Sequence, residues 1–249
     1  MTREINTKLF NDNGWVKIRN FSTKSEINEI KKKINQFLRK NYKQYSGRDI
    51  NFLSNKKDWK NINSFHKLHD CNFIQKFSKK KKIELLVKNF LNTKEIRLRA
   101  SELFAKPKKY GLDVPIHQDN FYWCIKDAKA LTMWIALEKT NKKNGGVFYF
   151  DKSHKLGLFK HVPSYKKGSS QMIKKNLKLK KLNKSYPSLN PGDCLVHHSL
   201  AVHGSNKNHS NNSRKGITFQ FVNFHSKIDI IRKTKYERSL KKQIQRRVY

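Results

Sequence analysis

Residues 195–221 read LVHHSLAVHGSNKNHSNNSRKGITFQF, and this stretch decides how the rest of the chain is interpreted. It begins with a short apolar segment, continues through a loop dense in Asn and Ser, and ends in a second apolar segment. Such a loop is typical of a connection between two antiparallel strands. His203 and Arg214 lie eleven residues apart. We therefore expect them on neighbouring strands, with both side chains facing the interior.

Other short segments have the same strand character. They are rich in aromatic and β-branched residues, and Gly, Pro, Asn and Ser turns separate them. One begins near residue 95 and ends at Lys106-Pro107. The others are expected at 114–118, 130–138, 146–150, 193–198 and 216–225. Many short strands of this kind favour an antiparallel barrel or jelly roll.

Two segments in the first third of the chain have helical periodicity. Residues 23–40 place their isoleucines on one face, and Thr23 with Glu26 forms a capping box at the start. A second helix is expected over 76–92, with irregular or short helical structure over 43–75.

The predicted organisation is a single domain over residues 1–249. A helical part (1–94) precedes a β-rich core (95–225). A basic tail (226–249), for which a helix is expected, follows the core. Residues 160–187 form a Lys-rich insertion with few structural signals.

The charge of the chain is unusual, because 56 Lys and Arg face 18 Asp and Glu, a formal net charge of +38. Such a field attracts nucleic acid, anionic membrane surfaces or phosphorylated substrates. The lysines are scattered along the chain and do not form one stripe with interleaved aromatics. This distribution favours a solvated basic surface over a dedicated nucleic-acid module, without excluding nucleic acid.

Targeting signals and disulfides are not evident in the sequence. No apolar stretch approaches the roughly 18 residues of a membrane span, and the N-terminus lacks the apolar core of a secretory signal. A cytoplasmic location is the default expectation. Cys71, Cys124 and Cys194 are far apart and odd in number, so we expect free buried thiols.

Residues 114–123, VPIHQDNFYW, place His117 and Asp119 two apart. In an extended segment such residues project to the same side and can reach one ion. Alone, this pair is weak evidence, and a surface histidine with a turn aspartate explains it better than a metal site does. With His203 it completes two histidines and one carboxylate, the facial triad of non-haem iron oxygenases. His197 and His198 are rivals of His203 for the third position.

The facial triad leaves three iron positions open. The keto acid end of 2-oxoglutarate can fill two of them, and dioxygen the third. The far carboxylate of 2-oxoglutarate then needs a cationic partner deep in the pocket. Arg214 suits this role, because a planar guanidinium binds a carboxylate through two parallel hydrogen bonds.

From about residue 100 to 222, the chain resembles the phytanoyl-CoA dioxygenase family of 2-oxoglutarate oxygenases. The matching pieces follow in the family's order: Lys106-Pro107, His117-Gln118-Asp119, Trp123, LTMWIALE at 131–138, Asn144-Gly145-Gly146, Ser153-His154-Lys155, Pro191-Gly192-Asp193, His203-Gly204-Ser205, Asn208 and Arg214. The resemblance implies a mainly β protein with flanking helices and a double-stranded β-helix core, which is a cupin-like jelly roll.

The resemblance also implies roles for individual residues. It makes His117, Asp119 and His203 the catalytic iron ligands. It places Arg214, Ser205 and Trp134 in contact with 2-oxoglutarate. Since related halogenases lack the carboxylate, Asp119 favours hydroxylation or desaturation over halogenation.

The chain departs from the family pattern at Asp151 and Lys152, where the family usually has Pro and Gly. The shape of that loop is therefore open, and His154 within it is expected to be structural.

Several further residues had two interpretations. Phe121, Tyr122 and Trp123 suit a substrate pocket or the core equally well. Lys106 suits contact with an anionic substrate or plain solvation. His66 and His69 have no evident partner in the sequence, and we expect them at the surface.

The expected function is that of an iron(II)- and 2-oxoglutarate-dependent dioxygenase. It would use O2 to hydroxylate a small organic substrate, with an anionic one favoured by the charge, and release succinate and CO2. One alternative is a non-catalytic basic protein that binds nucleic acid or anionic surfaces. Another is a zinc or manganese enzyme without 2-oxoglutarate, which the spacing of Arg214 disfavours. The sequence does not select the substrate or the oligomeric state.

Overall fold

The fold is built on two antiparallel sheets. The structure is a computed structural model that describes residues 2–53, 57–166, 169–174 and 176–247. The larger sheet has seven strands, in the order β1 (Trp15–Ile18), β11 (Cys194–His198), β6 (Ala130–Ala136), β13 (Arg214–Asn223), β4 (Ile96–Lys106), β3 (Ile62–Phe65) and β2 (Ile50–Phe52). Their pairings are all antiparallel.

The smaller sheet has four strands, in the order β10 (Lys184–Ser185), β7 (Val147–Phe150), β12 (His203–Ser205) and β5 (Val114–His117). One pocket takes its lining from both sheets, including Trp134 of β6 and His203 of β12. The two sheets therefore face each other across this pocket, as in a jelly roll. The predicted double-stranded β-helix core is confirmed, and every strand expected within residues 95–225 is present.

Strand alternation in β6 gives the larger sheet two different faces. Leu131, Met133 and Ile135 point to a core shared with the helices of the first third of the chain. Thr132 and Trp134 alternate with them and line the pocket instead. The register that buries the apolar face thus also orients the pocket residues.

Helix α2 (Lys24–Asn41) covers the apolar face of the larger sheet, and the capping box predicted at its start is present. Ile27, Ile30 and Ile34 are at most 3% exposed and pack in the shared core. Burial of each such side chain contributes about 1.5–3 kcal/mol.

The single helix predicted over 76–92 is two helices, α3 (Asn72–Ser78) and α4 (Lys81–Leu91). The Ser78 hydroxyl donates to the Gln75 carbonyl oxygen (2.7 Å), and Lys80 is extended (φ −58°, ψ 137°). These features end the first helix before the second begins.

The first third of the chain contains more than helices. Residues 43–75, expected to be irregular or short-helical, supply β2 and β3 as well as three short 3-10 helices. Strand β1 follows helix α1 (Thr2–Asn13) and pairs with β11. Strands β1 and β3 were missed because the strands they pair with, β11 and β4, lie more than 35 residues away in the sequence. Strand β2, which pairs with β3, is only three residues long.

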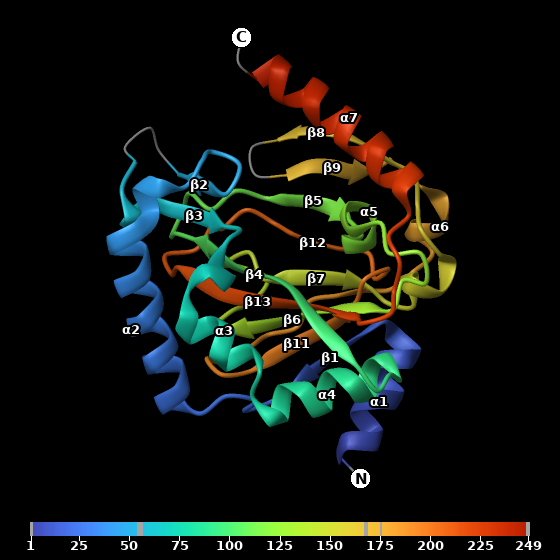
Figure 1. The fold of residues 1–249 in the computed structure, drawn as a ribbon, viewed down its shortest axis with the longest axis horizontal. Helices are drawn as coiled ribbons and strands as arrows, with labels where there is room; N and C mark the ends of the chain where they lie inside the picture. Colours follow the sequence, from blue (N-terminus) through green and yellow to red (C-terminus); the bar gives the residue numbers. More distant parts are fainter. Residues whose placement is uncertain (1, 54–56, 167–168, 175, 248–249) are drawn as a thin grey trace.

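The Lys-rich insertion and the basic tail are also structured. The insertion, whose sequence has few structural signals, contains β8 (His161–Lys166), β9 (Ser169–Ile173), α6 (Leu177–Lys180) and β10. The predicted helix of the tail is α7 (Ile230–Arg247). Figure 1 shows α7, in red, beside β8 and β9, at the end of the molecule away from α1 and α4. The remaining elements are α5 (Asp119–Trp123), η1 (Tyr42–Gln44), η2 (Trp59–Asn61), η3 (Leu68–Asp70) and η4 (Ser153–Leu156).

Candidate active site

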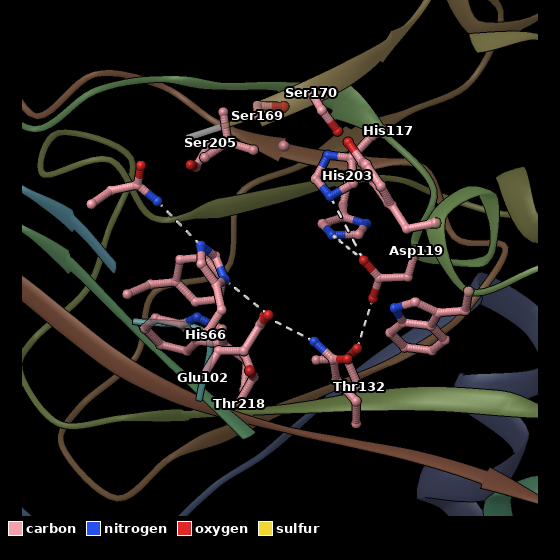
Figure 2. Close-up of a pocket in the computed structure, with 18 of the residues that line it drawn as sticks. His66, Glu102, His117, Asp119, Thr132, Ser169, Ser170, His203, Ser205 and Thr218 are labelled. Atoms are coloured by element: carbon pink, nitrogen blue, oxygen red, sulfur yellow. Dashed lines mark hydrogen bonds and ion pairs between the residues drawn. The ribbon is translucent and has the colours of Figure 1, made fainter. Parts of the chain in front are cut away.

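The pocket between the sheets has a volume of about 750 Å³. Figure 2 shows His117, His203 and Asp119 directed toward one another on one side, with His66 and Glu102 on the other. The metal end of the pocket is defined here as His117, Asp119 and His203. Their ligand atoms all lie within 4.8 Å of one another, in one group that could hold an ion.

Local structure places these three side chains. His117 ends β5, His203 begins β12, and the two residues are cross-strand partners. Asp119 begins α5, which is separated from β5 by the single residue Gln118. Gln118 between them points away and is fully buried, where its side chain bonds the Gly157 and Leu200 carbonyls (2.8 and 2.7 Å). His117 and Asp119, two residues apart, therefore face the metal position, whereas Gln118 between them holds the backbone in place.

Hydrogen bonds orient both imidazoles. The Nδ1 atom of His117 lies 2.9 Å from the Pro115 carbonyl oxygen, and that of His203 lies 3.0 Å from the Ala201 carbonyl oxygen. Since a carbonyl only accepts, each Nδ1 carries the proton and each Nε2 keeps its lone pair. Both Nε2 atoms lie 3.7 Å from Asp119 Oδ1. Such tautomers are those that metal coordination through Nε2 requires.

The carboxylate of Asp119 is held by its other oxygen. Asp119 Oδ2 accepts hydrogen bonds from Thr132 Oγ1 (2.7 Å) and His197 Nε2 (3.1 Å). Burial would raise the pKa of Asp119, but the imidazoles of His203, His117 and His197 around the carboxyl group hold that pKa well below its usual range. Burial and the neighbouring imidazoles lower the pKa of His203 well below its usual value. An ionised carboxylate and a neutral imidazole suit a divalent cation.

The rivals His197 and His198 occupy other positions. His197 is buried and supports Asp119, while Tyr149 Oη lies 2.9 Å from its Nδ1. His198 accepts from the Leu200 backbone N–H (3.0 Å) and packs beside His154. Neither joins the group that could hold an ion in the described residues. His197 is a supporting residue that sequence reasoning had considered only as a ligand.

Arg214 lies at the base of the same pocket and is 2% exposed. Its Nε and Nη2 atoms both donate to the Gly145 carbonyl oxygen (3.2 and 2.8 Å). Its Nη1 atom is buried and has no hydrogen-bond partner among the described residues. A buried donor without a partner is costly, so this atom marks a place for an anionic group.

The expected arrangement of His203 and Arg214 on neighbouring strands is wrong. Strand β12 pairs with β5 and β7, whereas β13 pairs with β4 and β6. The loop between them crosses from one sheet to the other. Both side chains still line one pocket, because they face each other across the barrel.

Ser205 and Trp134 also line this pocket near Arg214. The Arg214 guanidinium carbon lies 5.2 Å from the Trp134 ring centroid. A Cβ atom on Gly216 would lie 2.0 Å from the Trp134 ring, so only glycine fits there. The Trp134 ring thus packs directly against the backbone at Gly216 and lies beside the Arg214 guanidinium.

The sequence allowed Lys106 either to contact an anionic substrate or to be solvated. The residue is only 4% exposed. It is the cross-strand partner of Arg214, and its Nζ donates to Ser205 Oγ and the Asn206 carbonyl oxygen (both 2.6 Å). Burial, with the nearby charge of Arg214, lowers the pKa of Lys106 to about 6. Because Ser205 Oγ accepts from Lys106, its own hydroxyl hydrogen is available to the pocket.

The opposite wall of the pocket is defined here as His66, Arg99, Glu102 and Gln220. The expectation of His66 at the surface is wrong, because its Nδ1 lies 2.9 Å from Glu102 Oε1 and it lines the pocket. His69 instead accepts from the Ser101 backbone N–H (3.3 Å). The only sequence feature that pointed to Glu102 as a pocket residue was the alternation of strand 96–106, which places Glu102 on the same face as Phe104.

The aromatic residues after the first motif divide between two roles. Tyr122 and Trp123 line the pocket, and Phe121 stacks on His161 with ring centroids 4.1 Å apart. All three cysteines are buried and free, as predicted.

The departing loop closes without the family's Pro and Gly. Asp151 accepts from Trp15 Nε1 and Ser185 Oγ (both 2.8 Å), and Lys152 takes the left-handed conformation (φ +63°) that a glycine favours. His154 binds the Asn11 carbonyl oxygen (3.0 Å), as expected of a structural residue.

The donor set fits iron(II), because two neutral imidazoles and one carboxylate meet on one face of a water-accessible pocket. The unpartnered Nη1 of Arg214 fits a carboxylate of 2-oxoglutarate in that pocket. A jelly roll with this site defines the class of non-haem iron oxygenases. A family model described as phytanoyl-CoA dioxygenase (PhyH) matches residues 10–216. The chain belongs to the phytanoyl-CoA dioxygenase family and is a 2-oxoglutarate-dependent non-haem iron oxygenase.

Individual proteins resemble this chain to a similar degree. A probable phytanoyl-CoA dioxygenase of Caenorhabditis elegans is 25% identical over 232 residues, which are 87% of this chain and 74% of that protein. A probable alpha-ketoglutarate-dependent hypophosphite dioxygenase of Stutzerimonas stutzeri is 26% identical over 220 residues, 85% of this chain and 75% of that protein.

A solved structure shares the fold. EctD from S. alaskensis, solved with 2-oxoglutarate and 5-hydroxyectoine, has a TM-score of 0.73 at 16% identity and covers 90% of this chain and 77% of its own. The same protein with bound Fe has a TM-score of 0.74.

Proposed function

We propose that this oxygenase hydroxylates a small organic substrate that carries an anionic group. In this proposal His117, Asp119 and His203 hold iron(II), and Arg214, Ser205 and Trp134 hold 2-oxoglutarate. The observation that carries the proposal is the buried, unpartnered Nη1 atom of Arg214, a residue that lines the same pocket as a group of three metal-ligand side chains.

The iron and 2-oxoglutarate, with O2, supply oxidation of a substrate C–H bond with release of succinate and CO2. The protein's own residues orient these groups and limit water. Thr132 and His197 fix the carboxylate of Asp119, and Gly145 fixes Arg214. Such support holds a site in its reactive geometry before substrate arrives.

An anionic substrate is supported by the charge of the chain and by one of its relatives. The formal net charge is +38, and the Stutzerimonas stutzeri relative is named for hypophosphite, an anion. No feature of the described pocket favours the alternative of a non-catalytic binding protein. None of the helices in the described part of the chain combines the length and apolar character needed to cross a membrane. A cytoplasmic location stays a prediction.

The proposal is tested by anaerobic addition of iron(II) and 2-oxoglutarate to the purified protein. We expect the weak visible charge-transfer band of an iron(II)–2-oxoglutarate complex. Absence of the band in the wild type would contradict the cosubstrate assignment. Persistence of an unchanged band in Arg214→Ala would contradict only the role of Arg214. Lys215→Ala is the matched control, because Lys215 follows Arg214 on β13 but does not line the pocket.

A further inference from the structure

Arg99 occupies an unusual position on β4. The register between β4 and β13 shifts at Gln220 and Phe221, which pair with Ala100 and Leu98, so that Arg99 between them has no cross-strand partner. This irregularity is a β-bulge, a feature that often redirects a side chain beside an active site. Arg99 lines the pocket that also contains Asp119, and it is exposed although the next two residues are buried.

The guanidinium of Arg99 is held on one side only. Its Nη1 donates to Gln220 Oε1 (2.6 Å), and its central carbon lies 5.1 Å from the Trp123 ring centroid. Within the described residues, no carboxylate oxygen lies within 4.0 Å of it. An arginine stacked on an indole keeps its remaining edge free to bind an oxyanion through two hydrogen bonds.

The nearby acid does not neutralise Arg99, because Glu102 has other partners. Glu102 Oε1 lies 2.9 Å from His66 Nδ1, and Oε2 accepts from Gln220 Nε2 (2.9 Å). Burial opposes protonation of His66, but the charge and hydrogen bond of Glu102 raise its pKa. The amide of Gln220 thus stands between Arg99 and Glu102, and the charge of Glu102 is balanced by His66.

The charges in the loaded pocket also leave Arg99 without a balancing anion. Iron(II) and Arg214 together would carry three positive charges, and Asp119 with dianionic 2-oxoglutarate would carry three negative ones. The Glu102–His66 pair adds none when His66 is protonated. The remaining lining cations are Arg99 and Arg48, and Arg48 lies in the loop before β2.

We infer that Arg99 binds an oxyanion of the substrate, a carboxylate or a phosphate, and thereby sets which carbon faces the metal end. This inference deepens the proposed function and rests on it. Arg99 is a specificity-determining residue in this assignment, because it would contact the substrate and not the iron or 2-oxoglutarate.

The test measures binding to the anaerobic protein loaded with iron(II) and 2-oxoglutarate. Straight-chain alkanoates and alkyl phosphates of four to ten carbons (about the length that the pocket holds) are titrated by calorimetry. The matching carboxamides and alcohols are the neutral probes. Arg99→Gln, Arg99→Lys and the control Arg97→Gln are compared, since Arg97 lies two residues away on β4 and does not line the pocket.

We expect the wild type to bind an oxyanion at least about tenfold more tightly than its neutral counterpart. Arg99→Gln should remove this preference, Arg99→Lys should keep part of it, and Arg97→Gln should keep it. Whichever series binds more tightly, the alkanoates or the alkyl phosphates, shows whether Arg99 prefers a carboxylate or a phosphate. No preference in the wild type, an unchanged preference in Arg99→Gln, or its equal loss in Arg97→Gln would overturn the inference.

The inference and the proposed function fail in different ways. An absent charge-transfer band in the wild type contradicts the proposed function. A normal band together with any of the overturning results contradicts only the role of Arg99. The same band recorded in Arg99→Gln shows whether that variant folds and holds 2-oxoglutarate, and lost discrimination in a variant with a normal band supports the inference.

Discussion

The metal end and the opposite wall of the pocket differ in how their polar atoms are satisfied. At the metal end, each atom that does not face the ion position has a close partner: both Nδ1 atoms bind backbone carbonyls, and Asp119 Oδ2 accepts two hydrogen bonds. At the opposite wall, side chains bind mainly one another, and Arg99 keeps a free edge.

The two regions also differ in the segments that build them. The metal end sits on β5, α5 and β12, which belong to or adjoin the barrel. The space beyond it is bounded by Ser46–Arg48 before β2, Ser169 and Ser170 of β9, and Tyr236 of α7. A rigid reactive end and a wall assembled from peripheral elements would let the substrate change while the chemistry stays constant.

The largest effect is expected for Asp119→Asn. Thr132 and His197 both donate to this side chain, so the amide would turn its oxygen to them and present its NH2 group to the ion. We expect loss of stoichiometric iron(II) binding, measured by anaerobic calorimetry. Asp127→Asn is the control, since Asp127 accepts from Ser226 outside the pocket. Full iron binding by Asp119→Asn would break the claim that this end is built for a cation.

Arg214→Met tests the second anchor of the reactive end. Loss of one partner from a buried, charge-assisted contact costs about 2–5 kcal/mol, which is roughly 30-fold to several thousand-fold in affinity. We expect 2-oxoglutarate binding to weaken by that factor while iron(II) binding stays normal, as titration of the visible band would measure. A decrease of the same size in Lys215→Met would show that general charge, and not the Nη1 position, is responsible.

His197→Phe tests the support of the metal end. Removal of a partner that orients a ligand typically costs about 10–100-fold in metal affinity or activity. We expect a decrease in iron(II) affinity within this range, because Asp119 would lose one of the two donors to Oδ2. His198→Phe should leave iron affinity near the wild-type value, since His198 faces away from the group. Equal effects of the two variants would contradict the assignment of His197.

The same contrast explains what could be predicted from the sequence. His117, Asp119, His203 and Arg214 lie in two segments whose spacing indicates their chemistry, and all four line one pocket. His66 and Glu102 are 36 residues apart, and no local pattern joins them. Arg99 enters the pocket only because of a bulge, which single-sequence alternation does not reveal.

Two further features were missed for related physical reasons. The tail was expected to be helical, but its contact with the pocket depends on Tyr236 meeting Tyr122, whose ring centroid lies 5.6 Å away. The loop between β12 and β13 was taken for a hairpin because Asn and Ser favour turns of either kind. Composition describes such a turn, whereas the choice of sheet depends on tertiary packing.

The smallest effect is expected from Lys106, whose pKa of about 6 allows it to titrate near neutral pH. Bound 2-oxoglutarate would raise this pKa, so binding would take up a proton, and affinity would be highest below pH 6 and fall as pH rises through about 6 to 7. A screened interaction of about 1 kcal/mol through Ser205 corresponds to about a fivefold change in 2-oxoglutarate affinity.

Calorimetry in buffers of different ionisation enthalpy would measure the proton uptake. Lys106→Met should bind 2-oxoglutarate more weakly at pH 6 and lose this part of the pH dependence. Because His66 also titrates, the difference between wild type and Lys106→Met is the decisive quantity. An identical pH profile in both proteins would assign the titration to the opposite wall and leave Lys106 as a neutral donor that only positions Ser205.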